Sequence, residues 1–301
     1  MPILNVRHVT TYRYRQPVRF GEHRIMCRPR DSHDQRLLAA DLVIDPAPSE
    51  LLWRFDPFGN EVAVARFEAR ARELRFENHL RVALRPAGRP DARIEPGAQF
   101  WPFSYGAEEM PDLARFIERQ YRDPAHAVDR WVRRLLQDHA GGDTALILAD
   151  MAARIRRDFA YIQRDERGVQ DPAETLRLAS GTCRDFALLM MEAVRALGMA
   201  ARFVSGYLHN PRGGASGQHQ GAGATHAWMQ VYLPGFGWAD YDPTNAIADG
   251  RDLIRVATVR EPAQAVPLAG SYAGLPGDSL GMTVEVRVDE EPETPEGLLV
   301  R

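Results

Sequence analysis

The sequence has little cysteine and no long hydrophobic run. Only Cys27 and Cys183 occur among its 301 residues, and no segment approaches about eighteen consecutive apolar residues. The N-terminal stretch meets Arg7, Arg13 and Arg15 early, so it lacks the apolar core of a secretory signal. We therefore expect a cytoplasmic protein without a transmembrane helix, whose two cysteines remain thiols in a reducing compartment.

Charge of one sign is not concentrated in any segment. The 38 basic and 41 acidic residues are mixed along the chain, which leaves a net charge of −3 and no run typical of proteins that bind nucleic acid or anionic membranes. The metal-binding spacings HExxH and CxxC are missing, and so is an EF-hand loop. The sequence therefore predicts no nucleic-acid partner, no membrane partner, no metal and no other cofactor.

The pattern of apolar residues changes along the chain. Short alternating runs separated by turn signals predict an antiparallel β domain first, and patterns of helical period follow over 110–121, 124–139 and 143–160. The tail is acidic and contains proline, which is typical of disorder. We divide the chain into a β-rich N-terminal domain (1–95), a helical connecting segment (96–142), a domain that carries the motifs discussed below (143–289) and a disordered acidic tail (290–301).

Cys183 stands where a helix is expected to begin. Apolar residues recur at steps of three and four from 186 to 197, and Ser180 or Thr182 can act as the N-cap. The free N–H groups of the first turn then point at the sulfur and favour the reactive thiolate. The alternative is an inert buried thiol, because free cysteine is among the most buried residue types and Cys183 shares a helix face with Phe186.

His226 is the candidate base for such a thiol. It lies in a strand pattern over 225–233, on the face opposite the apolar residues of that strand. A lone histidine in a strand is more often structural than catalytic. An imidazole that acts as a base must be held in one tautomer by an acid or amide behind it, so the acids that follow decide its interpretation.

Two acids follow in a second strand pattern over 237–242, after a Pro-Gly turn. A two-residue turn would pair Asp242 with Met229 and direct the carboxylate away from His226, whereas a five-residue connection would pair Asp242 with His226 directly. Asp240 lies on the same face and competes for the same role. Spacing alone leaves both acids open.

Three separated motifs resemble the transglutaminase-like superfamily of papain-type cysteine enzymes: GTCRDFA at 181–187, THAWMQVYLPGFGW at 225–238 and YDPTN at 241–245. Upstream, YRYRQPV at 12–18, CRPRD at 27–31 and DPFGN at 56–60 resemble the β-rich region that accompanies the bacterial branch of this family. The resemblance implies an α+β fold, in which the nucleophile's helix packs on an antiparallel sheet that bears the other two site residues.

The resemblance also implies a division of roles. Cys183 is then the nucleophile, His226 the general base and acid, and Asp242 rather than Asp240 the residue that orients His226. The thiolate would attack the amide of a peptide or protein substrate and leave a thioester on Cys183. Hydrolysis by a cysteine protease or amidase is the leading expectation. A protein-glutamine transglutaminase, which transfers the acyl group to an amine, is the alternative with the same triad.

The remaining parts of the site are weaker expectations. The backbone N–H of Cys183 is a candidate oxyanion donor, and Tyr161, with Gln163 behind it, is a candidate for the second. Trp228 is expected to wall the site, although a tryptophan beside a histidine is as often part of the core.

Two other classes of function compete with this interpretation. A metal hydrolase would use His209, His219, His226 and either Asp240 or Asp242, but no known ligand spacing supports it. A noncatalytic binding protein of the same fold would usually lose a member of the triad, whereas all three matched positions are retained here.

Overall fold

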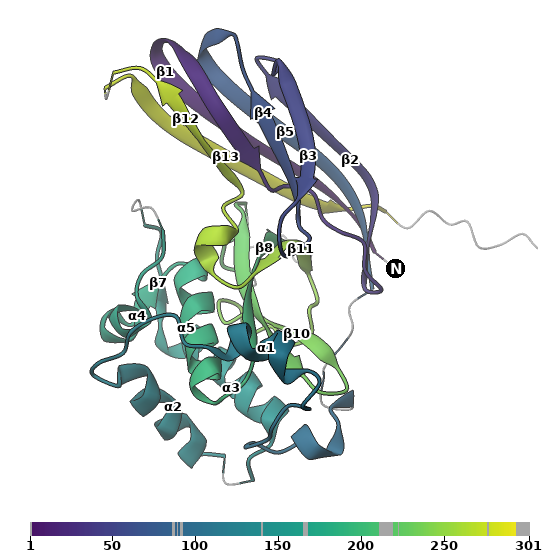
Figure 1. Cartoon of the computed structure of the whole chain (residues 1–301), viewed down its shortest axis with the longest axis vertical. Coiled ribbons are helices and arrows are strands. Elements are labelled where there is room, and N and C mark those ends of the chain that lie inside the picture. The colour runs from purple at the N-terminus through teal and green to yellow at the C-terminus, as the bar shows by residue number, and fades with distance from the viewer. Residues whose placement is uncertain are drawn as a thin grey trace, which may run out of the picture.

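The computed structural model describes residues 2–85, 88, 90, 93–139, 141–164, 168–210, 219–221, 223–275 and 277–292. Figure 1 shows two parts: long strands fill the upper half, and five helices pack with a smaller sheet in the lower half. Across the described ranges, no helix has the length and apolarity needed to cross a membrane. Cys27 and Cys183 are both free, as expected.

The upper part is a seven-stranded, antiparallel sheet. Its main path runs in the order β2-β5-β1-β4-β3. These strands are β1 (Ile3–Ile25), β2 (Gln35–Asp45), β3 (Glu50–Phe55), β4 (Glu61–Arg66) and β5 (Arg70–Leu84). Alternate residues such as Leu4, Val6, Leu80 and Val82 are buried, because successive side chains of a strand point to opposite faces. The β-rich N-terminal region is therefore present as predicted.

Two strands from the C-terminal part of the chain complete this sheet. β12 (Leu268–Ala273) and β13 (Ser279–Glu290) both pair antiparallel with β1. The predicted division, which assigned 143–289 to one domain, did not anticipate this return. Of the predicted tail over 290–301, Glu290 ends β13 and the side chain of Glu291 accepts hydrogen bonds from Arg81, while residues 293–301 lie outside the described ranges.

The lower part contains the predicted helices. They are α1 (Met110–Ile117), α2 (Ala127–Gln137), α3 (Thr144–Asp158), α4 (Pro172–Leu178) and α5 (Cys183–Ala196), with single turns of 3-10 helix at Pro96–Ala98 and Pro262–Gln264. Asp143 caps α3 by accepting a 2.8 Å hydrogen bond from the N–H of Leu146. α5 is the central helix, because its residues are buried on all sides along most of its length.

A four-stranded antiparallel sheet supports α5. Its order is β10-β9-β8-β11, from β8 (Ala201–Leu208), β9 (His226–Leu233), β10 (Gly237–Tyr241) and β11 (Leu253–Val259). Phe186 and Met190 of α5 belong to the same buried cluster as Met229 and Val231 of β9. This packing of the helix on an antiparallel sheet confirms the predicted α+β fold.

The β9–β10 hairpin has a register that neither sequence alternative described. Gly237 pairs with Leu233 and Asp240 with Gln230, so the connection is Pro234 to Phe236. Gly235 has a φ of +83° and the N–H of Phe236 donates to the carbonyl of Leu233 at 3.0 Å, which is a type II turn with Pro-Gly at its centre. Both predicted registers are therefore wrong, because each assumed a different turn length.

The observed register still brings the acid to the correct face. His226, Gln230, Asp240 and Asp242 all have the same parity in the hairpin, so their side chains point to the same side of it. β10 ends at Tyr241, and Asp242 forms a separate backbone bridge with Ile247. The carboxylate of Asp242 consequently lies beyond the end of the ladder, diagonal to His226 rather than opposite it.

Candidate active site

Cys183 is the first residue of α5, and the residue is 7% exposed. Thr182 has extended backbone angles and is the N-cap residue. The N–H of Cys183 belongs to the first turn, where N–H groups have no acceptor within the helix. The sulfur and any oxygen bound beside it therefore face unpaired backbone donors and the positive end of the helix dipole.

Asp185 organises the segment before Cys183. Its buried carboxylate accepts hydrogen bonds from Arg164 (two of 3.0 Å), from the N–H of Gln170 (2.6 Å) and from both the N–H and the hydroxyl of Thr182 (2.8 Å each). The sequence analysis did not identify this role. The spacing Thr182-x-x-Asp185 is a capping-box signal that could have shown part of it.

His226 and Asp242 form a buried pair. His226 Nε2 lies 2.9 Å from Asp242 Oδ2, and both side chains are inaccessible to solvent. Asp242 also accepts hydrogen bonds from the N–H of Thr244 and from Asn245 Nδ2, each 2.8 Å long. Burial opposes the charged form of Asp242, but the His226 charge and these hydrogen bonds hold the pKa of its carboxyl below the usual value. The pair therefore favours the ionised acid and an imidazole protonated on Nε2.

The second nitrogen of His226 lies beside Cys183. Nδ1 is buried and forms no hydrogen bond of regular geometry with the described residues. Burial would lower the pKa of His226, but Asp242 and, after it, the adjacent thiol of Cys183 raise it to about 10. An imidazolium beside the sulfur is the arrangement that favours a thiolate.

Asp240, the competing acid, is bound elsewhere. It accepts hydrogen bonds from Trp228 Nε1 (2.7 Å), Gln230 Nε2 (2.8 Å) and Arg255 Nη1 (3.1 Å). The structure thus places Asp242, and not Asp240, against His226. Trp228 is fully buried and its ring stacks on His226, with centroids 6.0 Å apart. It packs against one face of the imidazole and does not form an open wall.

Tyr161 and Gln163, the two candidates for the second oxyanion donor, differ in their exposure to solvent. Tyr161 lies in β6 (Ala160–Tyr161), which pairs in parallel with β7 (Ser180–Gly181), so the strand pair brings its side chain to the start of α5. Its hydroxyl is within hydrogen-bonding reach of Cys183, and burial together with the charge of Cys183 raises the pKa of Tyr161. Gln163 is exposed in the segment after β6. Tyr161 is therefore the better placed of the two.

The residues of the metal hypothesis do not assemble into one site. His209 and His219 both approach Asp252, at 3.5 and 3.7 Å, while His226 pairs with Asp242. Within the part of the chain that the structure describes, no group of three or more His, Cys, Asp or Glu side chains is arranged to hold a metal ion. Most of the glycine-rich stretch 209–224, whose conformation the sequence does not predict, lies outside the described residues.

The backbone at residues 220–221 lies close to the imidazole of His226. A Cβ atom added to Gly221 would lie 2.9 Å from Nδ1 of His226 and 3.5 Å from the hydroxyl of Tyr161. Asn245 fixes this segment, because it binds Asp242 and also the N–H (2.8 Å) and carbonyl (3.2 Å) of Gln220. Asn245 thus connects Asp242 to the segment that borders His226.

We expect Gly221→Ala to lower kcat by roughly ten- to a hundredfold, because the new methyl group would displace His226 by part of an ångström. Gly223→Ala is the matched control: Gly223 has the same φ of +86°, but nothing lies within 4 Å of its Cβ position. Both variants carry the same backbone strain. Steady-state kinetics in parallel with thermal unfolding separates the two effects, and an equal loss of kcat in both variants would contradict the role of the contact.

Two family models match this chain. The family model described as "Bacterial transglutaminase-like N-terminal region" matches residues 4–83, and the model described as "Transglutaminase-like superfamily" matches residues 129–243. The second match contains Cys183, His226 and Asp242, and the first covers β1 to β5 almost completely.

Individual relatives extend these matches. An uncharacterized protein of Mycobacterium tuberculosis is 30% identical over 304 residues, which cover 95% of this chain and 92% of that protein. A protein-glutamine gamma-glutamyltransferase of Pseudomonas aeruginosa is 32% identical over 162 residues, which cover 50% of this chain but only 23% of that protein. A crystal structure from Cytophaga hutchinsonii, named "Putative Cysteine Protease", covers 98% of this chain and 93% of its own with a TM-score of 0.70 and 18% identity, and so shows a shared fold.

Proposed function

Because this chain belongs to the transglutaminase-like superfamily, we propose that it is a thiol enzyme that cleaves amide bonds through an acyl thioester on Cys183. The observation that carries this proposal is the buried His226–Asp242 pair, 2.9 Å apart, beside a cysteine at the N-terminus of α5. A binding protein would have no need of an ionised pair sequestered next to a thiol, since burying charges is costly.

The first half of the reaction forms the thioester. The Cys183 thiolate attacks the amide carbon, and the carbonyl electron pair moves onto the oxygen. The N–H of Cys183 and the hydroxyl of Tyr161 are the donors we assign to this oxyanion. When the tetrahedral intermediate collapses, the C–N bond breaks and Nδ1 of His226 gives its proton to the departing amine. The free amine leaves, and the acyl group remains on sulfur.

The second half of the reaction returns the enzyme to its starting state. His226 Nδ1, now unprotonated, takes a proton from water as the water oxygen attacks the thioester carbon. Collapse breaks the C–S bond, so that a carboxylic acid is released and the thiolate–imidazolium pair is restored. Throughout, Asp242 accepts the Nε2–H hydrogen bond and keeps Nδ1 directed at the reacting atoms.

Hydrolysis is the reaction we propose first, with a peptide or protein amide as the substrate and no cofactor. Acyl transfer to an amine is the second candidate, and the observation that favours it is the similarity to the glutamyltransferase of Pseudomonas aeruginosa over half of this chain. The two reactions share every step up to the thioester. They differ only in whether water or an amine attacks it.

A trapping assay tests both reactions. Wild-type protein is incubated with a mixture of glutamine-containing peptides, quenched in acid and analysed by intact mass for an acyl adduct on Cys183. The incubation is then repeated with an excess of a primary alkylamine. We expect an adduct in both cases and free carboxylic acid as the main product even when the amine is present.

The products decide between the candidates. An amide formed with the added amine as the main product would replace hydrolysis by acyl transfer. An adduct that forms equally on Cys27, or no adduct with any peptide or with a small activated ester, would contradict the proposed chemistry.

A further inference from the structure

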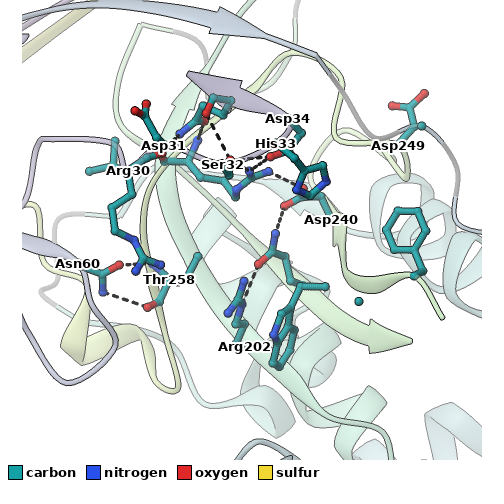
Figure 2. A pocket seen from close by; sticks show the side chains of 18 of the residues that line it. Arg30, Asp31, Ser32, His33, Asp34, Asn60, Arg202, Asp240, Asp249 and Thr258 are labelled. Atoms are coloured by element: carbon teal, nitrogen blue, oxygen red, sulfur yellow. Dashed lines mark hydrogen bonds and ion pairs between the residues drawn. The ribbon is translucent and has the colours of Figure 1, made fainter. Parts of the chain in front are cut away.

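A polar cavity of about 290 Å³ lies where the two parts of the molecule meet (Figure 2). The segment 30–35, between β1 and β2, forms one wall. The other is the face of the four-stranded sheet that points away from α5, with Arg202, Gln230 and Asp240. Its volume is at the lower end for small-molecule sites, so it suits a compact ligand.

Arg202 is held rigidly beside this cavity. Its Nε donates a 2.8 Å hydrogen bond to Gln230, its guanidinium lies 4.1 Å from the ring centroid of Trp238, and Gln230 is itself fixed by Asp240 at 2.8 Å. The two Nη nitrogens have no hydrogen-bond or carboxylate partner among the described residues, although Arg202 lines the cavity. The guanidinium of Arg202 is therefore held in one orientation, and its Nη N–H groups are available to bind a ligand.

The carboxylates that line the cavity bind groups other than the Nη nitrogens of Arg202: Asp31 accepts the N–H of Leu37, and Asp249 pairs with Arg251. Arg255 is neutralised by Asp34 at 2.5 Å and Asp240 at 3.1 Å. Arg30 and Arg93 line the cavity and, within the described residues, form no ion pair. Burial lowers the pKa of Arg202 to about 9; Asp240 opposes this effect, and Arg255 and Arg30 add to it. Because Asp240 is shared with Arg255, a further anion at the Nη nitrogens would stabilise the desolvated guanidinium of Arg202.

We propose that this cavity binds a small molecule through an oxyanion group, a phosphate or a carboxylate, held by the Nη edge of Arg202 with Arg30 and Arg93 beside it. The site goes beyond the proposed amide chemistry, since its residues take no part in the triad. It lies close behind the triad, because Asp240 also binds Trp228, and Trp228 stacks on His226.

Binding of defined probes to the full chain tests the proposal without any substrate. Isothermal titration and thermal unfolding are measured with inorganic phosphate and with succinate, at an ionic strength held constant with sodium chloride. We expect saturable binding of at least one probe and a higher Tm that the chloride control does not reproduce. The stronger probe identifies the oxyanion as phosphate or carboxylate.

Variants locate the binding. Arg202→Met keeps an unbranched side chain but removes the guanidinium and its charge, and we expect the Kd to rise at least about tenfold. Arg30→Gln changes an exposed residue, so it should fold and weaken binding severalfold. The matched control is Arg157→Met, at an exposed arginine paired with Asp158 on α3. Absence of saturable binding of either probe to the wild type, or affinities unchanged in both Arg202→Met and Arg30→Gln, would overturn the proposal.

Discussion

Replacing Cys183 by alanine is expected to lower amide cleavage by at least ~10⁴-fold, because the atom that would carry the acyl group is removed. The fold should survive. The side chain changes by a single sulfur atom, so the free energy of unfolding should change by roughly 1 kcal/mol. Turnover of the peptide mixture and urea unfolding of the same preparation measure the two quantities.

Cys27→Ala is the matched control for this experiment. Cys27 is the other free thiol, it lies in the core of the seven-stranded sheet, and burial raises its pKa to about 12. Iodoacetamide at pH 7 should therefore modify Cys183 and leave Cys27 unreacted, and Cys27→Ala should retain turnover. Equal, slow alkylation of both thiols would instead favour a noncatalytic protein of the same fold.

The second large effect is expected from Asp242→Asn, which should lower kcat by roughly 10³- to 10⁴-fold. Both carboxylate oxygens of Asp242 already accept hydrogen bonds, from Thr244 on one side and from His226 and Asn245 on the other. An amide cannot accept on both sides, so His226 would lose either its tautomer or its orientation. Steady-state kinetics with the same peptide mixture measures the loss.

Asp240→Asn is the comparison that separates the two acids. Asp240 binds Trp228, Gln230 and Arg255 and does not touch His226, so we expect a loss of kcat below about tenfold together with lower stability. If Asp240→Asn abolished turnover while Asp242→Asn retained it, the assignment of the orienting acid would be reversed.

The contribution of the His226–Asp242 pair to the stability of the fold depends on pH. The pKa of His226, raised to about 10, lies above the value of about 6.5 for a free histidine, so the imidazolium stabilises the fold fully below about pH 6.5. This stabilisation is lost as the pH rises through the folded value. In Asp242→Asn, burial is opposed less, so the residual kcat, which needs the His226 proton for the departing amine, should fall at a lower pH than in the wild type.

Local sequence patterns were sufficient to predict the elements that carry the triad. The steps of three and four after Cys183 predict α5, and strict alternation predicts β9, because each pattern reports a face that is buried against the core. The choice of Asp242 came from the family resemblance. Spacing alone could not have made it, because the hairpin register depends on the turn that Pro234 and Gly235 adopt.

Other features depend on contacts between segments that are distant in the sequence. Local sequence patterns cannot predict such contacts. The carboxylate of Asp185 binds Arg164 and Gln170, which approach it only after the chain folds. The polar cavity beside Arg202 is lined by segments that lie more than a hundred residues apart in the sequence. Neither segment alone could therefore predict which residues line it. Asn245 is in the YDPTN motif, yet its bond to Gln220 became evident only in the structure.

The return of β13 to β1 affects the order in which the molecule can fold. Asn5 and Glu291 meet across 286 residues of chain, so β1 cannot gain this neighbour during synthesis until β13 has been made. Contacts of such high sequence separation form slowly. β13 also donates the N–H of Val286 to the carbonyl of Gly223, near the segment that borders His226. A nascent chain therefore holds Cys183, His226 and Asp242 before this support is in place, and we expect the proposed activity to be complete only after β13 has docked.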